Sequence, residues 1–512
     1  MVHVINQPVT IWSSSILADP GSEAILDSLS LPADPGVTVH PLDTWSALRR
    51  YLLIGGIDRV LADPLPITIA DSEPVRTALA EDSLRVVAEV LAATAGGPSR
   101  PEPLLLALAL AASADDDLTR RAALTALPRV ARSSRDLFLF ATFVQSLRGW
   151  GRGLRRAVGS WYNDRSPEDL VEDVLSTPGF AGWRHADLLR LGHPKAPTMT
   201  HDAIYRWVVT GVSPPAILAD PTVPDAAPLL ARLAAATALS DTRDGSVAAE
   251  LIATHRLPLA TVPESLRRES SVWEALLPHL RPTELLSALP TLAAIGCLVP
   301  SNPVHELVRD RLTHSNANAP RRFTPLAVVA ARHAYEVGHS TMGRWDVDQR
   351  IMEALGRAFD FACLRIETGD QPITLRIPAG TCQQATTGGT FSALDLAATI
   401  AIVLSPAGSF ARIEVVGEVT LTLRLLPGAG IDEAVAAISR LAARAGSSSV
   451  GQEEVTISVT RPDGGVRAAL FGGPFVANRR HSDPNPSMEA ITIQGMDSNL
   501  VGTIFGLLQT FV

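Results

Sequence analysis

The residues best suited to chemistry lie close together, in the segment from Arg148 to Lys195. Arginines, histidines and tryptophans are concentrated there, although only 5% of the whole chain is aromatic and its net charge is -9. Guanidinium groups bind phosphate in a bidentate manner, and aromatic rings stack on unpaired bases. The mixture therefore favours nucleic acid as a ligand. The sequence runs are Leu147-Arg-Gly-Trp-Gly-Arg-Gly-Leu-Arg-Arg-Ala157, Trp161-Tyr-Asn163 and Gly182-Trp-Arg-His-Ala-Asp-Leu-Leu-Arg-Leu-Gly-His-Pro-Lys195.

The spacing of the arginines around Trp150 permits two local structures. In a continuous helix, the four arginines stand at i, i+4, i+7 and i+8 and share one face. Glycines at positions 149, 151 and 153 disfavour that helix, so a helix end followed by a new helix start near Gly153 is equally compatible with the sequence. The second arrangement leaves free backbone N–H groups, which also bind anions. The arginines concerned are Arg148, Arg152, Arg155 and Arg156.

A solvated surface without any ligand would explain the same arginines. From Arg148 to Lys195, eight Arg or Lys residues face six Asp or Glu residues, and in this interpretation they pair with one another. Core packing is likewise an alternative to base stacking for the aromatic residues, and helical spacing favours it for Trp161 and Trp183. The acids are Asp164, Glu168, Asp169, Glu172, Asp173 and Asp187, and the aromatic residues are Trp150, Trp161, Tyr162 and Trp183.

Sequence signatures of catalysis are missing. The Gly149-x-Gly151-x-Gly153 run and the Gly388-Gly389 pair are too short for a phosphate loop, and no Gly-x-Ser-x-Gly, His-Glu-x-x-His or Cys-x-x-Cys motif occurs. His185 and His193, eight residues apart, lack the spacing of metal ligands on a helix. The carboxylates Asp115 to Asp117 are expected to cap the following helix. We therefore predict a protein that is not an enzyme and uses no cofactor.

Composition describes an Ala- and Leu-rich helical protein without a membrane span. The longest apolar run, Leu104 to Ala112, is about half of the roughly 20 residues that a bilayer requires, so it is expected to be a buried helix. No signal peptide opens the chain, and we expect a cytoplasmic protein. Three separated cysteines, Cys297, Cys363 and Cys382, are expected to be packing residues. Because an acidic chain disfavours nonspecific wrapping of nucleic acid, any such site must be a local patch.

Two regions differ in their hydrophobic pattern. From residue 41 to 365, apolar residues recur at three- and four-residue spacing, which predicts a succession of short helices without strands and favours an α-solenoid of HEAT-like hairpins. Residues 1–40 are rich in Pro, Asp, Gly and Ser, and are expected to form an N-terminal arm. The clearest helices are Leu84 to Ala95, Leu118 to Ala131, Asp136 to Leu147, Ala226 to Leu239, Val272 to Leu280 and Thr283 to Ile295.

From residue 366 to 512, strands and helices alternate, as expected of an α/β domain with a doubly wound sheet of the von Willebrand factor A type. The predicted strands are Ile373 to Ile377, Arg412 to Val416, Val419 to Leu425, Val455 to Val459 and Ala490 to Ile493. The predicted helices are Ser392 to Val403, Asp432 to Ala443 and Leu500 to Phe511.

Several blocks of the chain resemble the TROVE family, the Ro 60 kDa autoantigen and its bacterial relatives. The segment from Leu147 to Lys195 is similar to the family's signature. Blocks on both sides of it resemble the family in the same order. These are Asp43 to Gly55, Val272 to Leu277, Leu292 to Gly296, Thr324 to Tyr335 followed by Gly338-His339, and Ile351 to Phe361.

The resemblance implies a TROVE module, a helical solenoid closed into a ring, with the von Willebrand factor A-like domain fastening its ends. It implies a monomeric, RNA-binding ribonucleoprotein component that holds a small structured noncoding RNA of the Y type on its outer surface. It further implies that single-stranded RNA ends enter the central hole, in RNA quality control, and that an exoribonuclease can be a partner. The residues implied to bind RNA are Arg148, Arg152, Arg155, Arg156, Arg184, His185, Arg190, His193 and Lys195.

The family's A domain usually holds a divalent cation at an Asp-x-Ser-x-Ser motif, whose hard oxygen ligands gather on one loop. Alignment with the family pattern places Ile377 at its aspartate and Ala379 at its first serine, and only Thr381 keeps a hydroxyl. Arg461 falls near the later aspartate, with Asp463 and Ser447 to Ser449 as the remaining substitutes. We therefore predict no metal at this site.

Two functions remain open from the sequence. The first is a Ro-like RNA-binding protein. The second is a protein-interaction scaffold that keeps the ring fold and has lost its affinity for RNA, in agreement with the acidic net charge and the degenerate metal site. Salt dependence separates them, because binding through arginines weakens steeply as salt rises.

Overall fold

The structure, a computed structural model, describes most of the chain between residues 43 and 501, all of it within one compact unit from His40 to Val512. The predicted arm of residues 1–40 lies outside the described residues. Described are residues 43–55, 59–60, 67–95, 100–212, 223, 226–314, 323–364, 366, 372–380, 392–406, 411–426, 428–446, 455–460, 466–471, 490–494 and 501.

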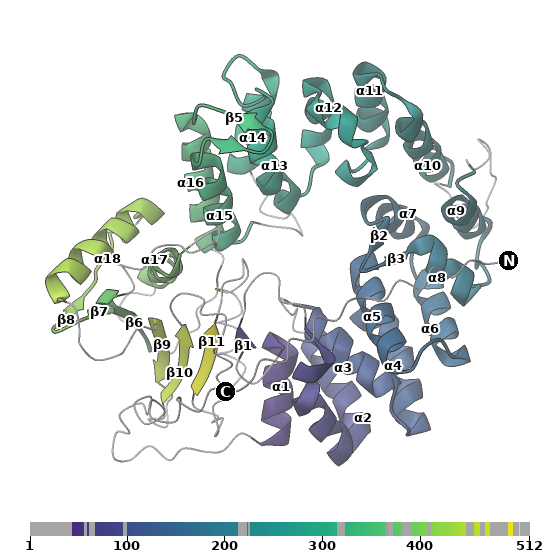
Figure 1. Ribbon diagram of the computed structural model, residues 1–512, viewed down its shortest axis with the longest axis horizontal. Coiled ribbons are helices and arrows are strands. Elements are labelled where there is room, and N and C mark those ends of the chain that lie inside the picture. The colour runs from purple at the N-terminus through teal and green to yellow at the C-terminus, as the bar shows by residue number, and fades with distance from the viewer. Residues whose placement is uncertain are drawn as a thin grey trace, which may run out of the picture. The chain divides into compact units, whose positions relative to one another are not determined.

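Helices follow one another from residue 44 to 363, as the apolar spacing predicts (Figure 1). All six of the clearest predicted helices are confirmed, and the one predicted from Val272 to Leu280 is divided into α12 and a short 3-10 turn, Leu277–His279. The helices are α1 (Thr44–Ile54), α2 (Glu73–Ala95), α3 (Glu102–Ala112), α4 (Asp117–Val130), α5 (Ser134–Leu147), α6 (Arg152–Asn163), α7 (Pro167–Ser176), α8 (His185–Gly192), α9 (Met199–Thr210), α10 (Ala226–Asp241), α11 (Gly245–His255), α12 (Ser270–Leu276), α13 (Pro282–Ala294), α14 (Pro303–Thr313), α15 (Pro325–Glu336) and α16 (Gln349–Cys363).

These helices pack mainly on near neighbours in the chain, the arrangement of a helical solenoid. Contacts pass from α2 to α3 and α4, from α4 to α6, from α6 to α8, and onward through α9, α10, α11 and α12 to α14 and α16. The apolar run Leu104 to Ala112 is buried in α3 against α2, α4 and α5, which confirms the predicted buried helix. None of the described helices has the length and apolar character of a membrane span.

Two expectations about individual side chains are confirmed in this region. Asp116 caps α4, since its carboxylate accepts hydrogen bonds from the backbone N–H groups of Leu118 and Thr119 at 3.2 and 2.8 Å. Cys297 and Cys363 are buried free thiols, as expected of packing residues, whereas Cys382 lies outside the described residues.

The expectation of a helical region without strands is wrong at three places, the first being β1 (Arg59–Val60) after α1. A short antiparallel hairpin, β2 (Gly179–Phe180) with β3 (Trp183–Arg184), precedes α8. A second, β4 (His339–Ser340) with β5 (Gly343–Arg344), precedes α16. Strands of two residues carry no alternation of apolar and polar positions, so the sequence pattern gave no sign of them.

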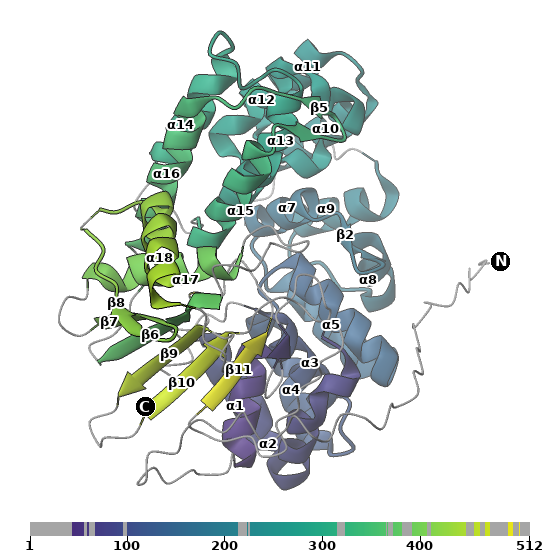
Figure 2. The same cartoon turned by 60° about the vertical axis from the view of Figure 1, so that its left-hand side comes forward.

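The C-terminal part contains a seven-stranded sheet with the order β1-β11-β10-β9-β6-β7-β8. All five predicted strands are confirmed, and β10 was not predicted. Figure 2 shows β9, β10 and β11 side by side. The strands are β1 (Arg59–Val60), β6 (Ile373–Pro378), β7 (Ala411–Val416), β8 (Thr420–Thr422), β9 (Val455–Thr460), β10 (Val466–Phe471) and β11 (Ala490–Gln494).

The order of strands β8-β7-β6-β9-β10-β11 is the 3-2-1-4-5-6 order of a doubly wound sheet, but their directions are mixed. β9 runs antiparallel to both β6 and β10, and β8 runs antiparallel to β7. Only five residues separate Thr460 from Val466, too few for the crossover of a dozen or so residues that parallel neighbours require. The expectation of a doubly wound sheet is therefore right in strand order and wrong in the directions of β8 and β9.

Helices α17 (Ala393–Leu404) and α18 (Ile431–Ala445) confirm two predicted helices, and the third, from Leu500 to Phe511, lies outside the described residues except for Val501. α17 contacts β6, α15, α16 and α18, which explains why it is buried along nearly its whole length. An ion pair of 2.6 Å between Arg332 of α15 and Asp432 of α18 adds a polar link. β1, which follows α1, pairs in parallel with β11.

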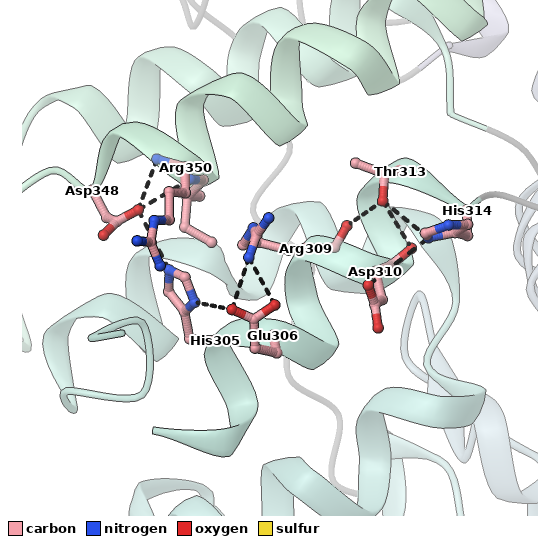
Figure 3. A network of polar contacts seen from close by, with 9 residues as sticks. His305, Glu306, Arg309, Asp310, Thr313, His314, Asp348 and Arg350 are labelled. Atoms are coloured by element: carbon pink, nitrogen blue, oxygen red, sulfur yellow. Dashed lines mark hydrogen bonds and ion pairs between the residues drawn. The ribbon is translucent and has the colours of Figure 1, made fainter. Parts of the chain in front are cut away.

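A polar network connects α14 to the start of α16 (Figure 3). His305 is fully buried, with Nε2 3.4 Å from the carboxylate of Asp348 and Nδ1 3.6 Å from that of Glu306. Asp348 is the N-cap of α16 and accepts hydrogen bonds from the backbone N–H groups of Arg350 and Ile351. Partial burial acts to raise the pKa of Asp348, but these hydrogen bonds and His305 outweigh it, so the pKa lies below its usual value.

Candidate nucleic-acid interface

The helix break near Gly153, one of the two arrangements open from the sequence, is the observed one. α5 ends at Leu147, Gly149 adopts a left-handed conformation with φ of 78°, and α6 begins at Arg152 with Gly151 as its N-cap. A residue with a side chain would be strained at position 149, which is why glycine ends the preceding helix there. The continuous helix carrying all four arginines is therefore excluded.

α6 separates a buried apolar face from an exposed basic one. Leu154, Val158 and Trp161 are buried in the core. Arg152, Arg155 and Arg156 are exposed, and within the described part of the chain none of them forms an ion pair. These three residues are called the α6 arginines below.

The N-terminus of α6 is open to an anion. No side chain caps it, and its first turn holds no acidic residue. The first backbone N–H groups of a helix have no partner inside the helix, and the helix dipole places partial positive charge at this end. The α6 arginines add three full positive charges to that field.

Ion pairing accounts for only some of the arginines between Arg148 and Lys195. Arg165 pairs with Asp173 at 3.5 Å, and Arg190 lies 4.0 Å from Asp187 while also donating to the backbone carbonyl of Val209 at 2.7 Å. Glu172 pairs outside the segment, with Arg232. The solvated-surface interpretation therefore holds for Arg165 and Arg190 but does not account for the α6 arginines.

The other basic residues predicted to bind RNA are also exposed, apart from His185. Arg148 and Arg184 lie at the end of α5 and on β3, and His193 and Lys195 follow α8. Gly192 brings the end of α8 to α6, since a Cβ atom at this glycine would lie 3.4 Å from the carbonyl oxygen of Arg155. His193 then turns the chain away from α8 in a left-handed conformation with φ of 45°. The end of α8 therefore packs against the backbone of α6 at Arg155 and Gly159.

His185 does not belong to this surface, and its prediction as an RNA-contacting residue is corrected. Its side chain is 2% exposed, forms a hydrogen bond of 2.8 Å with the Tyr162 hydroxyl and packs edge-on against Phe138. Burial, opposed by contacts with backbone carbonyls, lowers the pKa of His185 to about 4. As the first residue of α8 it points into the core, and it is neutral at ordinary pH.

The aromatic residues divide in a similar way. Trp161 and Tyr162 are buried, and the Trp161 indole donates a hydrogen bond to the carbonyl of Ala131 at 2.7 Å, so the predicted core role of Trp161 is confirmed. Trp150 and Trp183 are partly buried and lie against each other, with ring centroids 5.3 Å apart. They join the turn before α6 to the β2–β3 hairpin.

The predicted absence of a metal in the A-like domain concerns residues that are mostly outside the described part of the chain. Ile377 and Ala379 are buried at the end of β6, whereas Thr381, Arg461, Asp463 and residues 447–449 are not described. Among the described residues, no group of three or more His, Cys, Asp or Glu side chains could hold a metal ion. The absence of a metal stays a prediction.

A basic pocket near α10 was not predicted. It is lined by Arg232, Arg256 and Arg281, with two histidines, and has a volume of about 320 Å³. Arg232 lies in α10, Arg256 follows α11 and Arg281 precedes α13, and because they share no motif only folding brings them together. The one available sign in the sequence was the His255-Arg256 pair, which basic residues at the end of a helix explain equally well through the helix dipole.

Comparison with known proteins finds similarity to RNA-binding proteins of the RO60 type. No family model matches the chain. The chain is 30% identical over 345 residues to the RNA-binding protein RO60 of Deinococcus radiodurans. This alignment covers 66% of this chain and 63% of the relative. The chain is 24% identical over 329 residues to the RNA-binding protein RO60 of Caenorhabditis elegans, covering 52% of this chain and 51% of that protein. Both alignments thus span less than two thirds of the relative.

The fold is also similar to that of a Ro protein. The crystal structure of the Deinococcus radiodurans Ro (Rsr) protein matches with a TM-score of 0.75, covering 92% of this chain and 100% of that one. The sequence identity in this match is 23%, so it establishes the fold. Taken together, the comparisons show that the chain is similar in sequence to two RO60 proteins and has the fold of the Ro (Rsr) protein.

Proposed function

We propose that this protein binds RNA, and that the α6 arginines form the centre of the binding surface. The observation that carries the proposal is the open N-terminus of α6, where three exposed arginines have no acidic partner among the described residues. Two relatives named RNA-binding proteins support it.

Helix energetics support an anionic ligand at this place. Positive side chains in the first turn oppose the helix dipole and cost about 0.3–1 kcal/mol each at an exposed site. A phosphate beside α6 reverses this effect, because it accepts hydrogen bonds from both the guanidinium groups and the free backbone N–H groups. The local cost is therefore offset when a polyanion binds.

The finer features of the proposed function follow the family. A small structured noncoding RNA of the Y type binds the surface formed by Arg148, the α6 arginines, Arg184, Arg190, His193 and Lys195. Single-stranded ends of misfolded RNAs enter the central hole of a monomeric ring. The protein itself has no catalytic activity, acts in the cytoplasm in RNA quality control, and presents RNA to an exoribonuclease.

A protein-interaction scaffold is the second candidate, and the net charge of -9 favours it. An acidic protein repels RNA except where a local patch overcomes the overall field. The two candidates differ in whether RNA stays attached to the protein in cells and in whether binding depends on the α6 arginines.

Crosslinking tests the proposal directly. The protein is irradiated in its host cells and purified, and the attached RNA is sequenced. We expect one or two small structured RNAs, crosslinked within residues 148–195. In vitro, Arg152→Glu should weaken binding of that RNA, while Arg357→Glu, which changes an exposed arginine of α16, should not. Recovery of background RNA alone would favour the scaffold.

A further inference from the structure

The strongest feature that the proposed RNA surface does not use is the basic pocket near α10. It is lined by residues of four helices and the turns beside them: Glu172, Arg232, His255, Arg256, Pro258, Leu259, His279, Leu280, Arg281 and Glu284. Its volume of about 320 Å³ is at the lower end of the range for pockets that bind small ligands. The pocket is therefore lined by both basic and apolar side chains.

Two of the three arginines are already held in place by acids. Arg232 donates to Glu172 at 2.6 Å and to the backbone carbonyl of Arg256 at 2.9 Å, so it joins α7 to the end of α11. Arg281 pairs with Glu284, one turn into α13. These pairs fix the guanidinium groups but leave one positive charge in excess, because three arginines face two carboxylates.

Arg256 carries the excess charge. Its backbone has the left-handed φ of 49°, an uncommon conformation for a residue with a side chain, and ends α11 at the pocket. Its guanidinium group is exposed and has no hydrogen-bond or ion-pair partner among the described residues. A guanidinium group that lines a pocket and has no anionic partner among the described residues is suited to phosphate.

The surrounding histidine responds to this positive field. His279 forms a hydrogen bond of 3.1 Å with the backbone carbonyl of Leu257. Burial lowers the pKa of His279, and the charges of Arg232, Arg256 and Arg311 lower it further. A neutral imidazole beside Pro258 and Leu259 gives a flat, weakly polar wall of the kind on which a base or a ribose packs.

We propose that this pocket binds a phosphate-bearing ligand of the size of one nucleotide, with Arg256 and Arg281 on the phosphate and His279 with Leu259 against the nucleoside. A free nucleotide and the 5′-phosphorylated end of an RNA strand offer the same chemistry. The pocket is separate from the α6 arginines and can bind such a ligand whether or not RNA binds there.

Calorimetry with AMP tests the proposal on the full-length protein. We expect Arg256→Gln and Arg281→Gln each to weaken AMP binding by about 10- to 100-fold, the usual effect of removing a hydrogen bond to a charged group. Arg243→Gln is the matched control, since Arg243 is exposed in the turn before α11 and does not line the pocket. Arg256→Gln removes no contact that holds helices together, so it should fold normally.

Competition experiments identify the source of the phosphate. Displacement of AMP by a 5′-phosphorylated single-stranded oligonucleotide, but not by its 5′-hydroxyl form, assigns the pocket to RNA ends. Displacement by neither assigns it to free nucleotides. Absence of AMP binding, equal affinity for AMP and inorganic phosphate, or equal binding by the wild type and both arginine variants would overturn the proposal. Because Arg152→Glu should leave AMP binding unchanged, this test and the test of RNA binding fail independently.

Discussion

The rings of Trp150 and Trp183 lie 5.3 Å apart and tilted by 59°, which fastens the turn between α5 and α6 to the β2–β3 hairpin. The Trp150 indole also donates a hydrogen bond to Gln145 at 2.7 Å. Because the turn sets the direction of α6, this aromatic pair positions the α6 arginines without having to touch the ligand.

The pair should show measurable coupling. Trp150→Ala and Trp183→Ala each lower the free energy of unfolding, and the double variant loses about 0.5–1.5 kcal/mol less than the sum of the two. Urea unfolding of the four proteins measures this difference. RNA affinity should fall in both single variants because α6 loses its fixed direction. Strict additivity would show that the two rings do not support each other.

Arg152→Glu should have opposite effects on stability and on RNA binding. The new carboxylate at the start of α6 favours the helix dipole and raises the free energy of unfolding by about 0.3–1 kcal/mol. The same change removes a phosphate contact and should reduce the slope of log affinity against log salt by about one or more. Thermal unfolding and filter binding at several salt concentrations measure the two effects. A variant that loses both stability and affinity would indicate a purely structural role for Arg152.

His185 should make stability depend on pH. The pKa of His185 is about 4 in the folded protein, against 6.5 for an ordinary solvent-exposed imidazole. The unfolded chain thus binds a proton more readily between these values. The contribution to stability is complete above about pH 6.5 and is lost as the pH falls towards 4; it amounts to at most about 3 kcal/mol. His185→Gln should flatten the dependence of unfolding free energy on pH in this window, while the exposed His314→Gln should not.

Asp348 should stabilise α16 through its backbone hydrogen bonds and its contact with His305 (Figure 3). Asp348→Ala removes the N-cap, which costs about 1 kcal/mol, and leaves a buried imidazole without its carboxylate partner, which adds to the loss. Asp346→Ala, two residues away at an exposed position, is the control. In denaturant unfolding, Asp348→Ala should be less stable than Asp346→Ala by more than about 1 kcal/mol. A difference of only about 1 kcal/mol would show that the His305 contact adds nothing to the cap.

Sequence patterns predicted the helices well because a buried face repeats at helical spacing whatever its neighbours are. They also located the basic segment, since charge and residue type are visible without a fold. They could not show that His185 is buried and His193 exposed, because burial of His185 depends on packing against Tyr162, which is distant in the chain. The direction of β9 was accessible in principle, because Pro462, Asp463 and Gly464 are typical of a turn between antiparallel strands.

The basic pocket was inaccessible from the sequence for a different reason. Arg232, Arg256 and Arg281 are separated by entire helices, and each can be explained locally as a solvated cation. Their convergence depends on how α7, α10, α11 and α13 stack, which no local pattern reports.

The parallel pairing of β1 with β11 has a consequence for biosynthesis. Arg59 leaves the ribosome early, but its partner, Ile493, is made more than four hundred residues later. The helical hairpins contact near neighbours and can fold as they emerge, whereas β1 waits for the last strand of the sheet. A chain interrupted before residue 490 would leave the edges of β1 and β10 unpaired, and exposed strand edges promote aggregation. Complete synthesis is thus itself a condition for a soluble product.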